Sequence, residues 1–113
     1  MKPVYKRILL KLSGEGLMGN RPFGMDADVI RSLAQQIKDV HDCGVEICVV
    51  VGGGNIFRGA KEASKGMNRT VADHVGMLAT VMNALYIQNA LETIGVSARV
   101  LSGLNIPEVC EQY

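Results

Sequence analysis

Three consecutive glycines, Gly52 to Gly54, come directly after an apolar and β-branched run from Val45 to Val51. Glycine has no side chain, so three successive backbone N–H groups there can approach an anion closely. A second turn, Ser13-Gly14, follows the apolar run from Ile8 to Leu12 in the same way. Both patterns are typical of phosphate-binding loops beyond the ends of buried strands, although a tight turn without a ligand is the plainer alternative.

Two cations stand near these glycines. Lys11 interrupts the first apolar run, where a buried ammonium group is costly unless an anion meets it. The alternative is that Lys11 reaches water at the end of a strand, and its spacing alone leaves both readings open. Arg58 follows the triple glycine by four residues and carries the paired donors that match a phosphate group.

Neither of the common nucleotide-binding fingerprints is complete. A P-loop requires a Gly-Lys pair followed by Ser or Thr, and the chain has none. A dinucleotide-binding loop requires a third glycine where Phe57 stands. The glycines therefore predict an α/β protein that binds phosphate, without naming its ligand.

Strands and helices are expected to alternate. The apolar patterns predict strands over 8–12, 45–51 and 96–101, with one helix between Asp26 and Gly44 and another over about 68–94. This order favours right-handed crossovers and a parallel sheet whose strands are covered on both faces. Within the second helix, one apolar face recurs at helical spacing and is expected to face the core: Val71, Val75, Leu78, Met82 and Leu85.

Composition sets further bounds. The chain has 113 residues, one domain at most, and its net charge of +1 argues against a general nucleic-acid binder. Three cysteines without a C-x-x-C pair predict neither a disulfide framework nor a metal site. With no signal-like start and no apolar run of about 20 residues, we expect a cytoplasmic protein.

Four segments together resemble the bacterial UMP kinase branch of the amino acid kinase family: Lys11 to Glu15, Val51 to Gly59, Gly66 to Arg69 and Ala72 to Asn83. The resemblance implies a three-layer α/β/α fold with a parallel sheet and a homohexamer. It also implies phosphoryl transfer from ATP to UMP, giving UDP and ADP in pyrimidine nucleotide biosynthesis. Mg²⁺ would arrive with the nucleotide, with no protein ligand assigned.

The same resemblance assigns roles to individual residues. The catalytic residues would be Lys11 and Arg58, and UMP would be bound by Gly53 and Asp73. ATP would be bound by Lys11, Leu12, Ser13, Gly14, Gly54 and Arg58. The activator GTP would be bound by Gly19, Asn20, Arg21, Pro22, Phe23 and Gly24, and UTP would inhibit.

The length is the main departure from the family pattern. Residues 1–113 are expected to be the amino-terminal part of a single amino acid kinase domain, with little activity alone. Two alternatives remain open: another amino acid kinase acting on a carboxylate or carbamate, and a non-catalytic nucleotide-binding or interaction module. The Asp73-His74 pair argues against the first of these alternatives.

Overall fold

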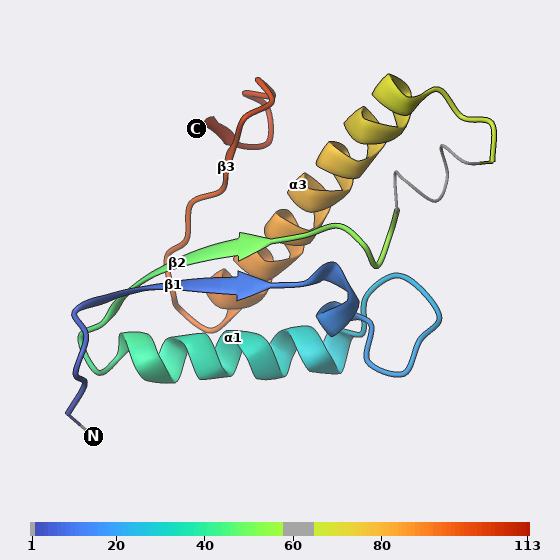
Figure 1. The fold of residues 1–113 in the computed structure, drawn as a ribbon. Coiled ribbons are helices and arrows are strands. Elements are labelled where there is room, and N and C mark those ends of the chain that lie inside the picture. The colour runs from blue at the N-terminus through green and yellow to red at the C-terminus, as the bar shows by residue number, and fades with distance from the viewer. Residues whose placement is uncertain (1, 58–64) are drawn as a thin grey trace.

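The computed structural model describes residues 2–57 and 65–113 of the chain (Figure 1). Its elements, in chain order, are β1 Arg7–Leu12, the 3-10 helix η1 Gly14–Leu17, α1 Ala27–His41, β2 Glu46–Val51, α3 Arg69–Thr93, β3 Leu101–Ser102 and β4 Glu111–Gln112. Neither α1 nor α3 combines the length and the apolar character that a membrane span needs.

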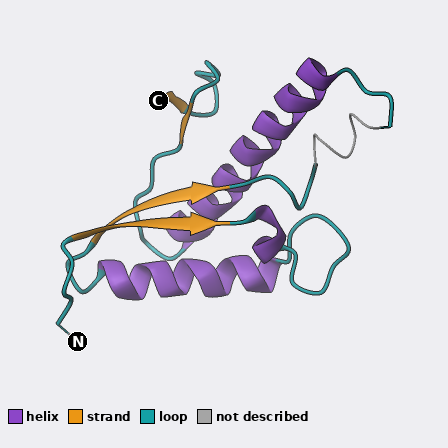
Figure 2. Ribbon diagram, viewed as in Figure 1, coloured by secondary structure: helices purple, strands orange, loops and turns teal. Residues whose placement is uncertain are grey.

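Strands β1 and β2 form a parallel pair joined by α1, as the alternation of elements predicts (Figure 2). The register runs without interruption from Arg7 opposite Glu46 to Leu12 opposite Val51. Beyond the last pair, the Gly52 N–H donates to the Leu12 carbonyl at 3.0 Å. Both strands therefore end at the same edge, and their following loops start side by side.

The helix ends follow local chemistry. The Asp26 carboxylate accepts hydrogen bonds from the N–H groups of Asp28 and Val29 and caps α1. Gly44 after α1 and Gly95 after α3 adopt φ angles of +92° and +87°, which residues with a side chain rarely adopt. The predicted boundaries of both helices are confirmed to within two residues.

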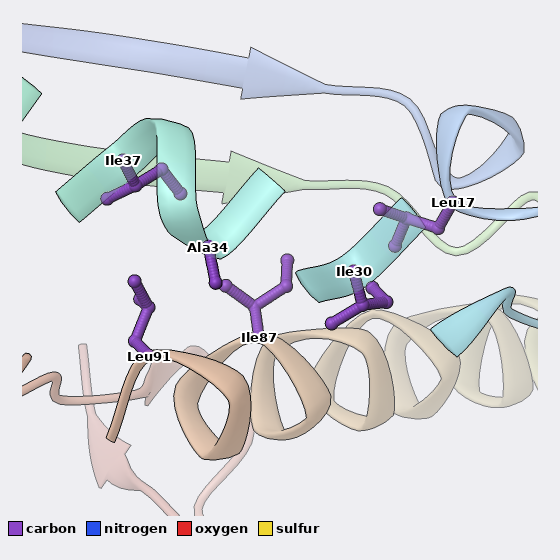
Figure 3. Packing of buried hydrophobic residues seen from close by; sticks show 6 residues of the cluster. All are labelled: Leu17, Ile30, Ala34, Ile37, Ile87 and Leu91. Carbon is purple, nitrogen blue, oxygen red and sulfur yellow. The ribbon is translucent and has the colours of Figure 1, made fainter. Parts of the chain in front are cut away.

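The core lies between the two helices and one face of the β1–β2 pair (Figure 3). Leu17, Ile30, Ala34, Ile37, Ile87 and Leu91 form its buried cluster. The inward side chains of β1 and β2, among them Leu10 and Val49, pack against this cluster. Each large side chain buried there contributes roughly 1.5–3 kcal/mol to the free energy of unfolding. This packing fixes the strand ends from which the glycine loops emerge.

The prediction that the strands are covered on both faces is wrong for the described residues. Leu9 on β1 is 62% exposed and Val50 on β2 is 50% exposed, and both project from the face opposite the core. In a parallel pair, alternate side chains point to opposite faces, so packing on one side leaves the other uncovered. A nearly continuous apolar run reveals only that both faces tolerate burial.

The third predicted strand, over 96–101, is also wrong in its extent and its partner. Only Leu101 and Ser102 form β3, which pairs in parallel with β4 rather than with β1 or β2. The Ser102-Gly103 turn therefore does not join the edge where the glycine loops lie. The short β3–β4 pair is held by backbone bonds such as that from the Glu111 N–H to the Val100 carbonyl, at 2.8 Å.

The buried side of α3 differs in part from the predicted one. Val71, Leu78 and Met82 are 51%, 47% and 46% exposed, whereas Val75 and Leu85 of the same predicted face are half-buried. The buried side chains are instead Ala72, Ala79, Val81, Asn83, Ile87 and Leu91. The small side chain of Ala79 allows the helix to approach the glycine loop closely, while Ile87 and Leu91 fill the core.

Candidate phosphate-binding site

The two glycine-bearing turns meet at the carboxyl edge of β1 and β2. A β-carbon on Gly14 would stand 2.5 Å from both the Gly54 backbone nitrogen and the Asn55 Oδ1 atom. No real β-carbon tolerates such a separation, so only glycine allows the first turn to press against the second. The predicted meeting of these loops is confirmed, and it requires glycine at position 14.

Helix α3 supports the triple-glycine loop, residues 52–54, from the other side. A β-carbon on Gly53 would lie 2.9 Å from the Ala79 β-carbon and 3.1 Å from the Thr80 backbone nitrogen. Beyond it, the N–H groups of Ile56 and Phe57 both donate to the Gly53 carbonyl, at 3.0 and 2.9 Å. The loop is thus a compact turn held between η1 and α3.

The N–H groups of Gly53 and Gly54 are not engaged by any backbone or side-chain acceptor among the described residues, 2–57 and 65–113. The Glu15 carboxylate lies over Gly54, where it would overlap a β-carbon built on that residue. An anion reaching these amides therefore meets the Glu15 side chain at the same place, and this flexible side chain has to move.

A buried pair of side-chain amides lies beneath the loop. Asn55 and Asn83 are 1% and 0% exposed, and they exchange two hydrogen bonds of 3.2 and 2.7 Å. Asn83 Nδ2 also donates to the Gly52 carbonyl at 2.7 Å. Asn55 Nδ2 donates to the Gly24 carbonyl at 2.9 Å. The glycine loop is consequently fastened to α3 and to the segment before α1.

Lys11 lies at the end of β1 on the uncovered face of the sheet, with an exposed side chain. Of the two readings that the sequence leaves open, the one in which Lys11 reaches water at the end of a strand is confirmed, because only one face of β1 is packed. Lys11 lines a cavity of ≈ 500 Å³ with Ser13 and with Asp28 and Ser32 of α1. This cavity flanks β1 and does not include the triple-glycine loop.

The other residues assigned to ATP continue from Lys11. Leu12 is half-buried and provides the carbonyl that receives the Gly52 N–H. Ser13 caps η1, its hydroxyl accepting a hydrogen bond from the Gly16 N–H at 3.2 Å. Arg58, the remaining residue assigned to ATP, lies outside the described residues.

Asp73 lies near the start of α3. Its carboxylate accepts a hydrogen bond from Arg69 Nε at 3.1 Å, and its side chain is 53% exposed. It precedes Thr80 by seven residues, so both share one face of the helix, about 10 Å apart along the axis. Asp73 thus projects from the same side of α3 that touches Gly53, two turns further out.

The segment assigned to GTP, residues 19–24, forms a surface loop between η1 and α1 (Figure 1). Gly19 and Gly24 have φ angles of +59° and +82°. Asn20, Arg21, Pro22 and Phe23 are exposed, the last by 70%. Arg21 lies 4.0 Å from the Asp26 carboxylate. The Gly24 N–H donates to the Asn55 carbonyl at 2.7 Å, which connects this loop to the triple-glycine loop.

Sequence reasoning assigned no role to Glu15, Asn55, Thr80 or Asn83. Two polar residues in the otherwise apolar stretch of α3, Thr80 and Asn83, are spaced by three and continue the face of Asp73. That spacing could have indicated a helix face turned toward a polar loop. Within the described parts of the chain, no cluster of three or more His, Cys, Asp or Glu is placed to hold a metal ion.

The amino acid kinase family matches residues 6–111 of this sequence. The chain belongs to the amino acid kinase family. Among its curated relatives, the uridylate kinases of Paramagnetospirillum magneticum and Dichelobacter nodosus are 57% identical over 109 residues and 54% identical over 112 residues. These alignments cover 96% and 99% of this chain.

Solved structures of this kinase family agree with the fold. The UMP kinases of Bacillus anthracis and Ureaplasma parvum superpose with TM-scores of 0.86 and 0.87, each at 35% identity and over 96% of this chain. The chain spans about half the length of its relatives: 45% and 46% of the two uridylate kinases, and 45% and 46% of the two structures.

Proposed function

We propose that this chain is the amino-terminal, phosphate-binding part of a UMP kinase domain, which transfers the γ-phosphoryl group of ATP to UMP. The proposal rests on the arrangement of the two glycine-bearing turns. The turns after β1 and β2 meet at one edge, and no described residue accepts a hydrogen bond from the Gly53 or Gly54 N–H group. The similarity to uridylate kinases supplies the identity of the substrates.

The transfer itself asks little covalent chemistry of the protein. An oxygen of the UMP phosphate attacks the γ-phosphorus of ATP, the bond from that phosphorus to the β,γ-bridging oxygen breaks, and ADP leaves with the electron pair. The attacking oxygen is already ionised, so no proton has to be removed first. Positioning and charge stabilisation are therefore the main contributions of the protein.

Each group has a role in that scheme. The Gly53 and Gly54 amides would donate to phosphate oxygens, which a preorganised loop does without reorganising during the reaction. Lys11, with Ser13 and Gly14 beside it, would approach the donor phosphates, and its exposed ammonium group can move toward them. Arg58 is proposed for the same purpose on sequence grounds. Asp73 would bind UMP from the outer turns of α3.

Mg²⁺ would accompany ATP and neutralise charge on the phosphate oxygens, as it does when bound by the nucleotide itself. The described residues place no acidic cluster that would hold the ion independently.

Regulation and assembly extend the proposal. The exposed Arg21 and Phe23 in the loop 19–24 suit an anionic purine nucleotide, which supports GTP as its ligand. The resemblance further implies inhibition by UTP, a cytoplasmic location and a homohexamer.

The deciding experiment is calorimetric titration of the chain with UMP and then with MgATP, with acetylglutamate as the competing acceptor. We expect weak binding of UMP and ATP and none of acetylglutamate. Binding of acetylglutamate in preference to UMP would favour a different amino acid kinase. Nucleotide binding without UDP formation, even when the remaining half of a relative is added, would favour a non-catalytic module.

A further inference from the structure

The Asn55–Asn83 pair is saturated with hydrogen bonds although both side chains are buried. The two Nδ2 groups donate to Asn83 Oδ1 and Asn55 Oδ1 and to the carbonyls of Gly24 and Gly52. All four side-chain N–H hydrogens are used, and each side-chain oxygen accepts from the other residue. A buried amide that loses its partner carries a large desolvation cost, so this arrangement resists change.

The pair joins three segments that are distant in sequence. Asn83 belongs to the middle of α3 and bonds the triple-glycine loop at the Gly52 carbonyl. Asn55 bonds both backbone groups of Gly24, accepting from its N–H at 2.7 Å and donating to its carbonyl at 2.9 Å. Among the described residues, hydrogen bonds connect Asn83 to Gly24 through Asn55. Asn55, which directly follows the triple-glycine loop, therefore links Asn83 to the loop 19–24.

Packing alone does not require amides at these positions. Apolar side chains could fill the space between α3 and the loop. They could not donate hydrogen bonds to the Gly24 and Gly52 carbonyls, and these bonds fix the orientation of the peptide units that contain the two carbonyls. The Gly52 carbonyl and the Gly53 N–H belong to the same planar peptide unit, so orienting one orients the other. Asn83 thus determines where the Gly53 N–H points.

We propose that Asn55 and Asn83 are positioning residues: Asn83 orients the Gly53 amide toward phosphate, and Asn55 couples the loop 19–24 to it. Their part in phosphate binding rests on the proposed function, whereas the coupling of the two loops does not. A molecule that binds the loop 19–24 would then change the phosphate affinity of the glycine loop through Asn55.

Amide hydrogen exchange, followed by NMR on the whole chain, tests the coupling. In Asn83→Ala we expect the Gly24 and Phe57 N–H groups to exchange about tenfold faster than in wild type, the factor expected from one lost buried hydrogen bond. The matched control is Gln88→Ala, which removes another amide of α3 that donates to a backbone carbonyl, that of Ala98 at 3.0 Å. Exchange at Gly24 that is unchanged in Asn83→Ala, or equally raised in Gln88→Ala, overturns the coupling.

If Asn83→Ala does not fold, Asn83→Ser takes its place, because a hydroxyl retains one donor in a smaller volume. Faster exchange at Gly24 than in Gln88→Ala again supports the coupling. The wild-type rate at Gly24 in a folded Asn83→Ser chain overturns it, since serine has one donor where Asn83 uses two, to Gly52 and to Asn55.

Titration with sodium tripolyphosphate separates this inference from the proposed function. In wild type we expect the Gly53 and Gly54 N–H resonances to shift, and in Asn83→Ala we expect an affinity about tenfold lower than in Gln88→Ala. Equal affinities in these two variants overturn the positioning role. If wild type shows no shift, the proposed phosphate site fails and the positioning role fails with it, while the exchange rates still decide the coupling.

Discussion

Gly14 approaches Gly54 so closely that a β-carbon on Gly14 would stand 2.5 Å from the Gly54 backbone nitrogen. The same β-carbon would lie 2.9 Å from the Asn55 backbone nitrogen. Neither neighbour is the end of a flexible side chain, so nothing there can yield without moving a loop. The Ser13-Gly14 turn therefore packs directly against the triple-glycine loop.

Gly14→Ala is accordingly expected to weaken both the fold and ligand binding. Overpacking of this kind costs about 1–3 kcal/mol of the free energy of unfolding. The displaced loop should also lose its affinity for tripolyphosphate. Urea denaturation and NMR titration measure the two effects. Gly16→Ala serves as the control, because a β-carbon there would meet only the Ser13 hydroxyl, at 3.5 Å. Equal stability of the two variants would contradict the close contact.

Gly54→Ala is expected to separate binding from stability. Its new methyl group would meet the Glu15 carboxylate, which is the end of a flexible side chain and can turn away. Gly54 does not have a positive φ, so alanine fits its backbone. We therefore expect a change in unfolding free energy below about 1 kcal/mol, typical of a tolerated substitution.

The binding of tripolyphosphate to Gly54→Ala should nevertheless fall by about tenfold or more, because the methyl group stands beside the Gly54 N–H, which has no acceptor among the described residues. A charge-assisted hydrogen bond to a phosphate oxygen is worth at least this factor. NMR titration of the loop resonances checks it. Wild-type affinity in a folded Gly54→Ala chain would mean that phosphate does not approach this side of the loop.

Lys11→Ala isolates the contribution of one cation. The Lys11 side chain is exposed, so its removal should change the unfolding free energy by less than about 0.5 kcal/mol. Affinity for ATP should fall roughly tenfold, as expected when one charged hydrogen bond to phosphate is lost. Lys6→Ala is the matched control, since Lys6 is equally exposed but precedes the opposite end of β1. Calorimetry measures the ATP affinity of both variants. Equal losses of affinity would mean that Lys11 contributes only through its general positive charge.

The glycine loops and the helix ends were predictable because their signals are local. Asp26 caps α1 through its nearest neighbours in sequence, and Gly44 adopts the positive φ that ends the helix. The meeting of the loops at one edge follows from two parallel strands of equal length. None of these features depends on residues far away in the chain.

The features that could not be predicted depend on what covers each surface. The run containing Leu9 is apolar on both faces, so it does not reveal which face this chain packs. Helix α3 has apolar residues around much of its circumference, and the stripe of Val71, Leu78 and Met82 looks the same buried or exposed. Nothing in the sequence near Asn83 distinguishes it from an exposed polar residue, because its partner Asn55 is brought opposite it only by the fold.

The ion pair of Arg99 and Glu111 predicts a pH effect near the β3–β4 pair. Arg99 Nε donates to Glu111 Oε2 at 2.7 Å, and this hydrogen bond holds the pKa of Glu111 below its usual value. Because the folded-state pKa is lowered, the stabilisation is present above the unfolded-state pKa and is lost as pH falls through the folded-state pKa. Since both groups are exposed, the effect on overall stability should be small.

Arg99→Gln is expected to raise the pKa of Glu111 toward its usual value. NMR titration of the Glu111 carboxyl carbon measures the midpoint directly. Arg31→Gln is the control, because Arg31 pairs with Asp28 on α1 instead. The same Glu111 midpoint in wild type and Arg99→Gln would show that the ion pair does not persist in solution.

Leu9 and Leu17 offer a matched test of which surfaces this chain buries. Leu17 is 2% exposed within the core, so Leu17→Ala should cost about 2–5 kcal/mol of unfolding free energy. Leu9 is 62% exposed on the outer face of β1, so Leu9→Ala should cost well under half as much. Urea denaturation at two protein concentrations measures both. A large, concentration-dependent loss for Leu9→Ala would contradict the expectation, because it would mean that copies of the chain cover this face for one another.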